Sequence, residues 1–93
     1  GLDSKSLNHQ INEAIRKYKR NEVDNSLNML KNYERYFPNN LRILNCLAVI
    51  YYHKKEYQES LEYYLKIKQL DKGNKEAEEI IEKLKKITGS IAD

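Results

Sequence analysis

The sequence predicts an all-α protein made of two antiparallel helical hairpins and a closing helix. Apolar residues recur at the three- and four-residue spacing of amphipathic helices, and no segment shows the alternation of a strand. Glycine and proline are scarce, with three and one in 93 residues, so few positions interrupt the helices. The sequence also repeats at an interval of 34 residues, which is typical of stacked helical hairpins.

The first hairpin is predicted from two helices, at residues 5–20 and 23–36. The first helix has one apolar stripe, formed by Ile11, Ala14, Ile15 and Tyr18. The second carries Ser26 and Leu30, and Pro38 follows its end, because proline does not continue a helix.

The second hairpin is predicted from helices at residues 40–54 and 57–70. The core of the first of these is predicted to be Leu44, Leu47, Ala48 and Tyr51. Leu61 and Tyr64 continue the apolar pattern in the second. This helix is expected to end in a turn at Gly73, a residue that can adopt a positive φ.

A fifth helix is predicted at residues 74–88, ending at Gly89. Its apolar stripe consists of Ala77, Ile80, Ile81 and Leu84. We expect this helix to cover the apolar face of helix 57–70 as a cap, followed by a tail at 89–93.

The 34-residue interval divides the chain into two repeats and a cap within a single domain, residues 1–93. The repeats cover residues 7–40 and 41–74, and the cap covers about 75–88. Residues that coincide after the shift include Leu7 with Leu41, Ala14 with Ala48, Tyr18 with Tyr52, and Ser26 with Ser60.

The second repeat resembles the tetratricopeptide family. Its signature positions hold Leu44, Leu47, Ala48, Tyr51, Ser60 and Tyr64 at the family's spacing. Ala48 and Ser60 occupy the small-residue positions at which the two helices of a hairpin touch. Lys72 departs from the pattern, since the family usually has proline there.

The first repeat matches less well. Its second half has Ser26, Leu30 and the closing Pro38. In its first helix, however, polar residues replace the family's large apolar residues: Gln10, Glu13 and Lys17. An end repeat has no preceding neighbour, so we interpret this as a polar outer face.

The resemblance implies a short right-handed solenoid that acts as a protein-binding adaptor or scaffold. In this family the first helices of successive hairpins line a concave groove for a peptide or protein. The residues expected to face it are Asn12, Ile15, Lys19, Arg42, Asn45, Val49, Tyr52 and His53. The same stripes also contain Asn8, Ile11, Tyr18 and Cys46, and Glu76, Glu79 and Lys83 continue them on the cap. For Ile11, Ile15 and Tyr18 the alternative is a place in the core, because they also form the apolar stripe of their helix.

One subgroup of the family clamps the acidic C-terminal tails of chaperones with Lys and Asn side chains. Two of those positions here hold Ile11 and Ile15, and the next Asn position holds Cys46. The resemblance therefore does not extend to that clamp.

Other function classes have little support in the sequence. The 17 basic and 14 acidic residues, with a net charge of +3, are interleaved, which disfavours nucleic-acid binding. No apolar run is long enough for a membrane span, and the N-terminal residues do not resemble a signal peptide. The single Cys46 is compatible with a reducing compartment such as the cytoplasm.

Neither an enzyme nor a cofactor or metal site is predicted. Cys46 and His53 lie seven residues apart on one helix, about 10.5 Å at 1.5 Å per residue, which is too far for a nucleophile and its base. His9 and Glu13 have the i, i+4 spacing of a ligand pair, but such pairs are common on surfaces. We therefore expect a binding module, or alternatively a self-association module that forms dimers or stacks end to end.

Overall fold

A computed structural model describes residues 4–89, and no strand occurs among them. Its helices are α1 (Ser4–Lys19), α2 (Val23–Tyr36), α3 (Leu41–His53), α4 (Tyr57–Leu70) and α5 (Lys75–Thr88). The predicted all-α fold is confirmed, and each boundary lies within one residue of its predicted position. Of the predicted tail, residues 90–93 lie outside the described part.

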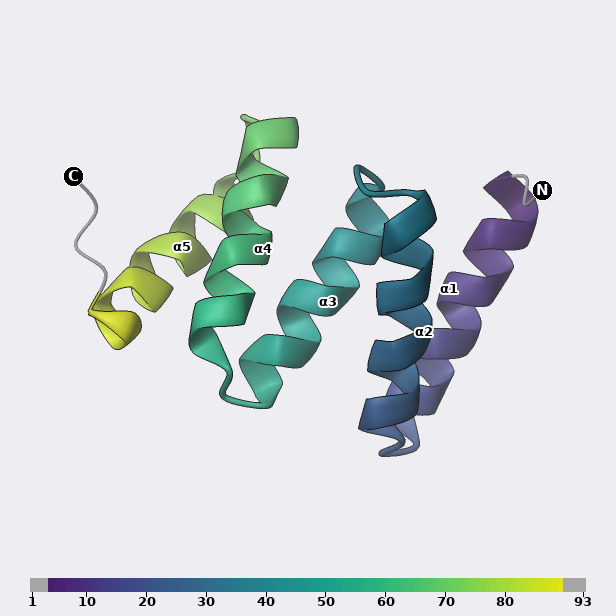
Figure 1. Cartoon of the computed structure of the whole chain (residues 1–93). Helices are drawn as coiled ribbons and strands as arrows, with labels where there is room; N and C mark the ends of the chain where they lie inside the picture. The colour runs from purple at the N-terminus through teal and green to yellow at the C-terminus, as the bar shows by residue number, and fades with distance from the viewer. Residues whose placement is uncertain (1–3, 90–93) are drawn as a thin grey trace.

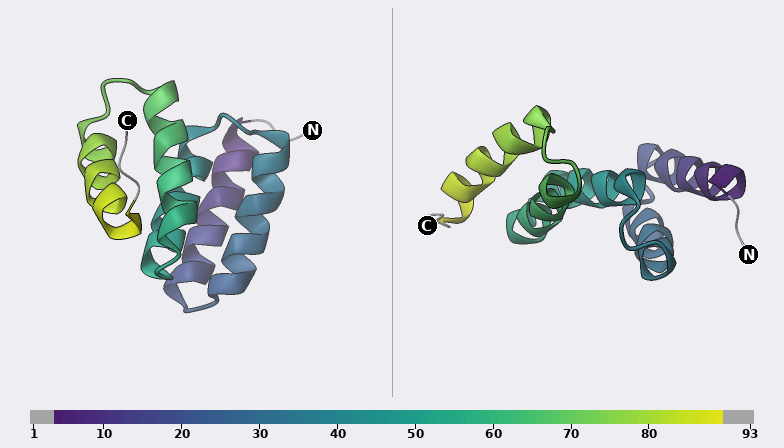
Figure 2. Two further views of the ribbon diagram at one scale, coloured as in Figure 1. Left: turned by 60° about the vertical axis from the view of Figure 1, so that its left-hand side comes forward. Right: turned by 90° about the horizontal axis from the view of Figure 1, so that it is seen from above.

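Successive helices run antiparallel and pack side by side (Figure 1). Seen from above, α1, α3 and α5 lie on one side of the array and α2 and α4 on the other (Figure 2). The strongest packing is between α3 and α4, and α1 contacts both α2 and α3. The arrangement therefore has two layers, one of odd-numbered and one of even-numbered helices.

The 34-residue interval is visible in the turns inside the two hairpins. Asn21 and Lys55 occupy equivalent positions and have positive φ angles of 69° and 64°. The next backbone N–H groups, of Glu22 and Glu56, each donate to the carbonyl five residues earlier at 2.9 Å. Asn tolerates this left-handed conformation well, whereas Lys adopts it at a cost in strain.

The N-termini of α3 and α5 are also equivalent. The side-chain oxygens of Asn40 and Asn74 accept hydrogen bonds from the backbone N–H groups of Ile43 and Ala77, at 3.1 and 2.9 Å. Each bond satisfies a donor in the first turn that has no partner within the helix. The same residue type thus starts the helix after each hairpin.

The expectation for Gly73 is wrong, because this residue does not have a positive φ. Among the described glycines only Gly89 does, at 73°, directly after α5. The α4–α5 turn is instead closed by the Asn74 N–H donating to the carbonyl of Asp71 at 3.1 Å. The α2–α3 turn makes the equivalent bond at 3.2 Å without any glycine, so this turn does not need one.

The helices of each hairpin touch at a pair of small residues. The hydroxyl of Ser26 donates to the carbonyl oxygen of Ala14 at 2.7 Å, and Ser60 donates to Ala48 at 2.8 Å. All four residues are fully buried. A hydroxyl can reach a backbone carbonyl of the facing helix only if no larger side chain separates the helices, so these pairs set the hairpin spacing.

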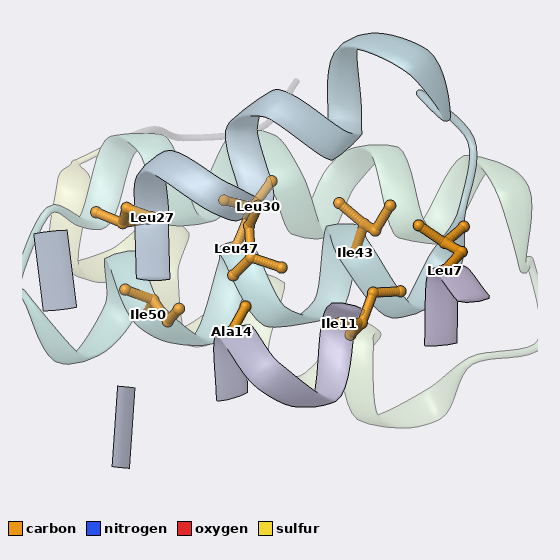
Figure 3. Close-up of a cluster of buried hydrophobic side chains, with 8 residues drawn as sticks. All are labelled: Leu7, Ile11, Ala14, Leu27, Leu30, Ile43, Leu47 and Ile50. Atoms are coloured by element: carbon orange, nitrogen blue, oxygen red, sulfur yellow. The ribbon is translucent and has the colours of Figure 1, made fainter. Parts of the chain in front are cut away.

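Two apolar clusters stabilise the array. The first joins α1, α2 and α3 (Figure 3) and contains Leu7, Ile11, Ala14, Leu27, Leu30, Ile43, Leu47 and Ile50. The second joins α3, α4 and α5 and contains Leu44, Ala48, Leu61, Tyr64, Ile67, Ala77, Ile81 and Leu84. Because α3 lies between two other helices, it contributes to both clusters.

More of α3 is buried than its predicted apolar stripe indicated. Tyr51 is only half-buried and stacks on Tyr63, with ring centroids 5.7 Å apart. Ile43 and Ile50 are buried instead, on the face towards α2. A single amphipathic stripe describes a helix with one buried face, whereas α3 has two.

The two ends of the array are polar where α3 is apolar. The face that α3 turns towards the first cluster holds Ile43, Leu47 and Ile50; the equivalent α1 residues are His9, Glu13 and Arg16. The α3 residues Leu44, Ala48 and Tyr51 correspond to Glu78, Glu82 and Lys85 on α5. The helix α5 still packs on α4 through Ala77, Ile81 and Leu84. Both terminal helices thus cover the array and present charged outer faces.

The close contact between α3 and α4 leads to the first prediction. Ala48→Leu should lower the free energy of unfolding by about 1–3 kcal/mol, because the added carbons overfill a packed contact. Urea unfolding measures this change. The neighbouring Val49, which is partly exposed, supplies the control Val49→Leu, for which we expect almost no change. Equal stability of both variants would contradict the proposed contact.

Candidate functional site

The odd-numbered layer contains a hollow of about 290 Å³ between α1 and α3. It is open to solvent, and its exposed surface is apolar. The residues around it are Ile15, Tyr18, Lys19, Asn45, Cys46, Val49 and Ile50. An aliphatic side chain from outside could therefore be buried between the two repeats.

Two further hollows adjoin the first. One, of about 380 Å³, lies at the C-terminal ends of α1 and α3 and is lined by Tyr18, Lys19, Asn21, Val23, His53 and Lys54. The other, of about 290 Å³, lies between α3 and α5 and is lined by Val49, Tyr52, His53, Tyr64, Glu76, Ile80 and Lys83. Val49 and His53 each belong to two of the three hollows. We refer to the three hollows together as the groove.

Six of the eight residues expected to face a groove line these hollows: Ile15, Lys19, Asn45, Val49, Tyr52 and His53. The other two, Asn12 and Arg42, do not. The Arg42 guanidinium bridges α3 to α1 by donating to the side-chain oxygens of Asn12 at 2.8 Å and Asn8 at 3.1 Å. Arg42, Asn8 and Asn12 therefore form a polar bridge beside the groove.

The wider stripes are divided between groove and core. The sequence left Ile11 open between groove and core; it is fully buried and belongs to the first cluster, so its place is the core. Tyr18 and Cys46 line hollows while packing partly on that cluster. On the cap helix, Glu76 and Lys83 line a hollow and Glu79 does not.

Ile50, Tyr64 and Ile80 also line the groove, although the sequence did not place them there. Ile80 was assigned to the covered stripe of the cap and is half-buried. The 34-residue interval contains the missing signal, since Ile80 is equivalent to Cys46.

A row of aromatic rings runs from α1 across α3 to the start of α4. A hydrogen bond connects the Tyr18 hydroxyl to Nδ1 of His53, and the two rings are stacked with centroids 6.1 Å apart. Tyr52 meets both His53 and Tyr57 edge to face, at 6.0 and 5.6 Å. These contacts hold α1 against α3, and α3 against the start of α4, without filling the hollows.

The electrostatics of the groove disfavour a nucleophile. Burial raises the pKa of the Cys46 thiol, an effect that the nearby Arg42 only partly opposes, so the thiol stays protonated at neutral pH. Burial also raises the pKa of Tyr64 to about 12, and Glu76 and Tyr52 add to the shift. Within residues 4–89, no three His, Cys, Asp or Glu side chains gather in a way that could hold a metal ion.

Comparison with known proteins does not identify a family. No protein-family model matches the sequence, and no curated protein matches it either. None of the helices in the described part of the chain is long and apolar enough to cross a bilayer.

The Tyr64 hydroxyl leads to the second prediction. Its pKa is about 12 in the folded protein, against a reference value of 10.0, so the unfolded chain releases this proton first. Stability should therefore fall as the pH rises from about 10 to 12. Tyr64→Phe should make this fall shallower in urea unfolding at a series of pH values. Tyr36→Phe, at a residue that is 71% exposed, should not. Equal slopes for wild type and Tyr64→Phe would contradict the assignment.

Proposed function

We propose that this chain is a protein-interaction module of the tetratricopeptide type. It binds a segment of a partner protein in the groove on the layer of α1, α3 and α5, and it catalyses no reaction. The observation that carries the proposal is the continuity of the three hollows. The α3–α5 hollow shares Val49 with the α1–α3 hollow and His53 with the hollow at the helix ends. An extended polypeptide could therefore occupy them together, with side chains entering successive hollows.

The repeat geometry supports the family assignment. Two hairpins 34 residues apart have equivalent turns, equivalent Asn caps and equivalent contacts between a serine hydroxyl and an alanine carbonyl. The family resemblance rests on the same small residues, Ala48 and Ser60. These equivalent features therefore support the proposed resemblance.

The array ends favour this proposal over end-to-end self-association. Stacking of copies would bury the outer faces of α1 and α5, which carry charged residues such as Arg16 and Glu82 at positions where α3 is apolar. Arg16 is paired with Glu13 and Glu82 with Lys85, and removing such exposed ion pairs from water costs desolvation energy. The exposed apolar surface of the groove lies elsewhere, between the helices of the odd-numbered layer.

The third prediction tests the groove with two matched variants. Val49 in the groove and Leu65 on α4 are exposed to similar extents, 37% and 39%. Peptides selected from a random displayed library for binding to the wild-type protein serve as ligands. We expect Val49→Asp to weaken their binding about tenfold or more, since it places a charge in the central contact. Leu65→Asp should change it less than about twofold.

Fluorescence anisotropy measures both affinities, and circular dichroism confirms that both variants keep the helical content and melting temperature of the wild type. If Leu65→Asp abolishes binding while Val49→Asp does not, the partner docks on the even-numbered layer and the proposed site is wrong.

A further inference from the structure

The part of the groove between α1 and α3 has an unbalanced charge. No Asp or Glu lines either of its two hollows. Lys19 lines both, and none of the ion pairs among the described residues involves it. Lys54 differs, because Glu56 and Asp24 neutralise it at 3.0 and 3.8 Å. Lys19 is therefore an unpaired cation at the edge of an apolar hollow.

Arg42 supplies a second cation where α1 and α3 meet, a place that we call the α1–α3 joint. Within residues 4–89, its guanidinium donates to the amide oxygens of Asn8 and Asn12, and none of the ion pairs there involves it. Because the acceptors are neutral amides, these bonds orient the group without neutralising its charge. On α3, Arg42 lies one helical turn before Cys46, which lines the hollow, and its charge opposes the rise that burial causes in the pKa of that thiol. The bridge thus holds an arginine next to the apolar surface.

The apolar surface between these cations includes Ile15, Val49 and Ile50. Val49 is 37% exposed, so a ligand that covers it removes apolar area from water. The α3–α5 part of the groove has no such imbalance, since it contains both Glu76 and Lys83. A charge preference is therefore expected at the α1–α3 joint.

We propose that this joint binds an acidic segment of the partner with an aliphatic side chain at its centre. The aliphatic side chain enters the hollow at Val49, and carboxylates on its two sides face Lys19 and Arg42. Side-chain carboxylates are sufficient, and no chain terminus is required. The inference rests on the proposed function and adds the chemistry of the ligand to it.

Three synthetic peptides with blocked ends test this inference. The first has a central leucine flanked on each side by acidic residues, the second has lysines in place of the acidic residues, and the third is the acidic peptide with glycine in place of leucine. We expect the first to bind about tenfold more tightly than either of the others. Its affinity should fall as salt is added, because exposed charges are screened.

Charge reversal in the protein locates the contact. Lys19→Glu should weaken binding of the acidic leucine peptide about threefold to tenfold. Arg35→Glu, at an exposed arginine on α2, makes the same change in net charge and should have almost no effect. If the two variants weaken binding equally, only net charge is involved and the inference fails.

The remaining outcomes separate this inference from the proposed function. If the lysine peptide binds as tightly as the acidic one, or if the acidic peptide does not bind, the inference is wrong. Library-selected peptides that remain sensitive to Val49→Asp would still support a groove. If light scattering shows self-association that Val49→Asp abolishes, the occupant is a second copy of the chain, and the acidic segment is excluded as its ligand.

Discussion

The groove depends on how closely the two helices of each hairpin approach. In the first hairpin the Ser26 hydroxyl donates to the carbonyl oxygen of Ala14, and in the second the Ser60 hydroxyl donates to that of Ala48. A larger side chain at any of these positions would separate the layers. Both hairpins have this contact, and α3 packs between its neighbours and contributes to both apolar clusters. The odd-numbered helices then lie beside one another with hollows between them.

The charged ends restrict where such an array can interact. The outer face of α1 has His9 and Arg16 at positions where α3 has isoleucines, and α5 has Glu78 where α3 has Leu44. These faces remain solvated, whereas the hollows around Val49 leave apolar surface in contact with water. Comparing positions 34 residues apart therefore reveals the repeat and also distinguishes the charged end faces from the apolar groove.

Much of the fold could be predicted because the repeat is local and periodic. Helix boundaries, the cap and the small-residue contacts follow from spacing along the chain, and six of the eight predicted groove residues line hollows. The failures involve tertiary packing. Tyr51 was assigned to the core but is half-buried, and the burial of Ile43 and Ile50 was not predicted, because one amphipathic stripe does not show how many neighbours a helix has. The Tyr18–His53 contact and the Arg42 bridge join residues about one repeat apart, and no local pattern identifies such pairs.

The central claim is that the layer of α1, α3 and α5 is the binding face, and amide chemical shifts measured by NMR test it most directly. Titration with a bound peptide should shift backbone amides along residues 15–19, 45–53 and 76–83. Amides on the exposed side of α2 and α4 should keep their positions, because the groove linings include almost no residues from these helices. Shifts concentrated on α2 and α4, with α3 unchanged, would contradict the account.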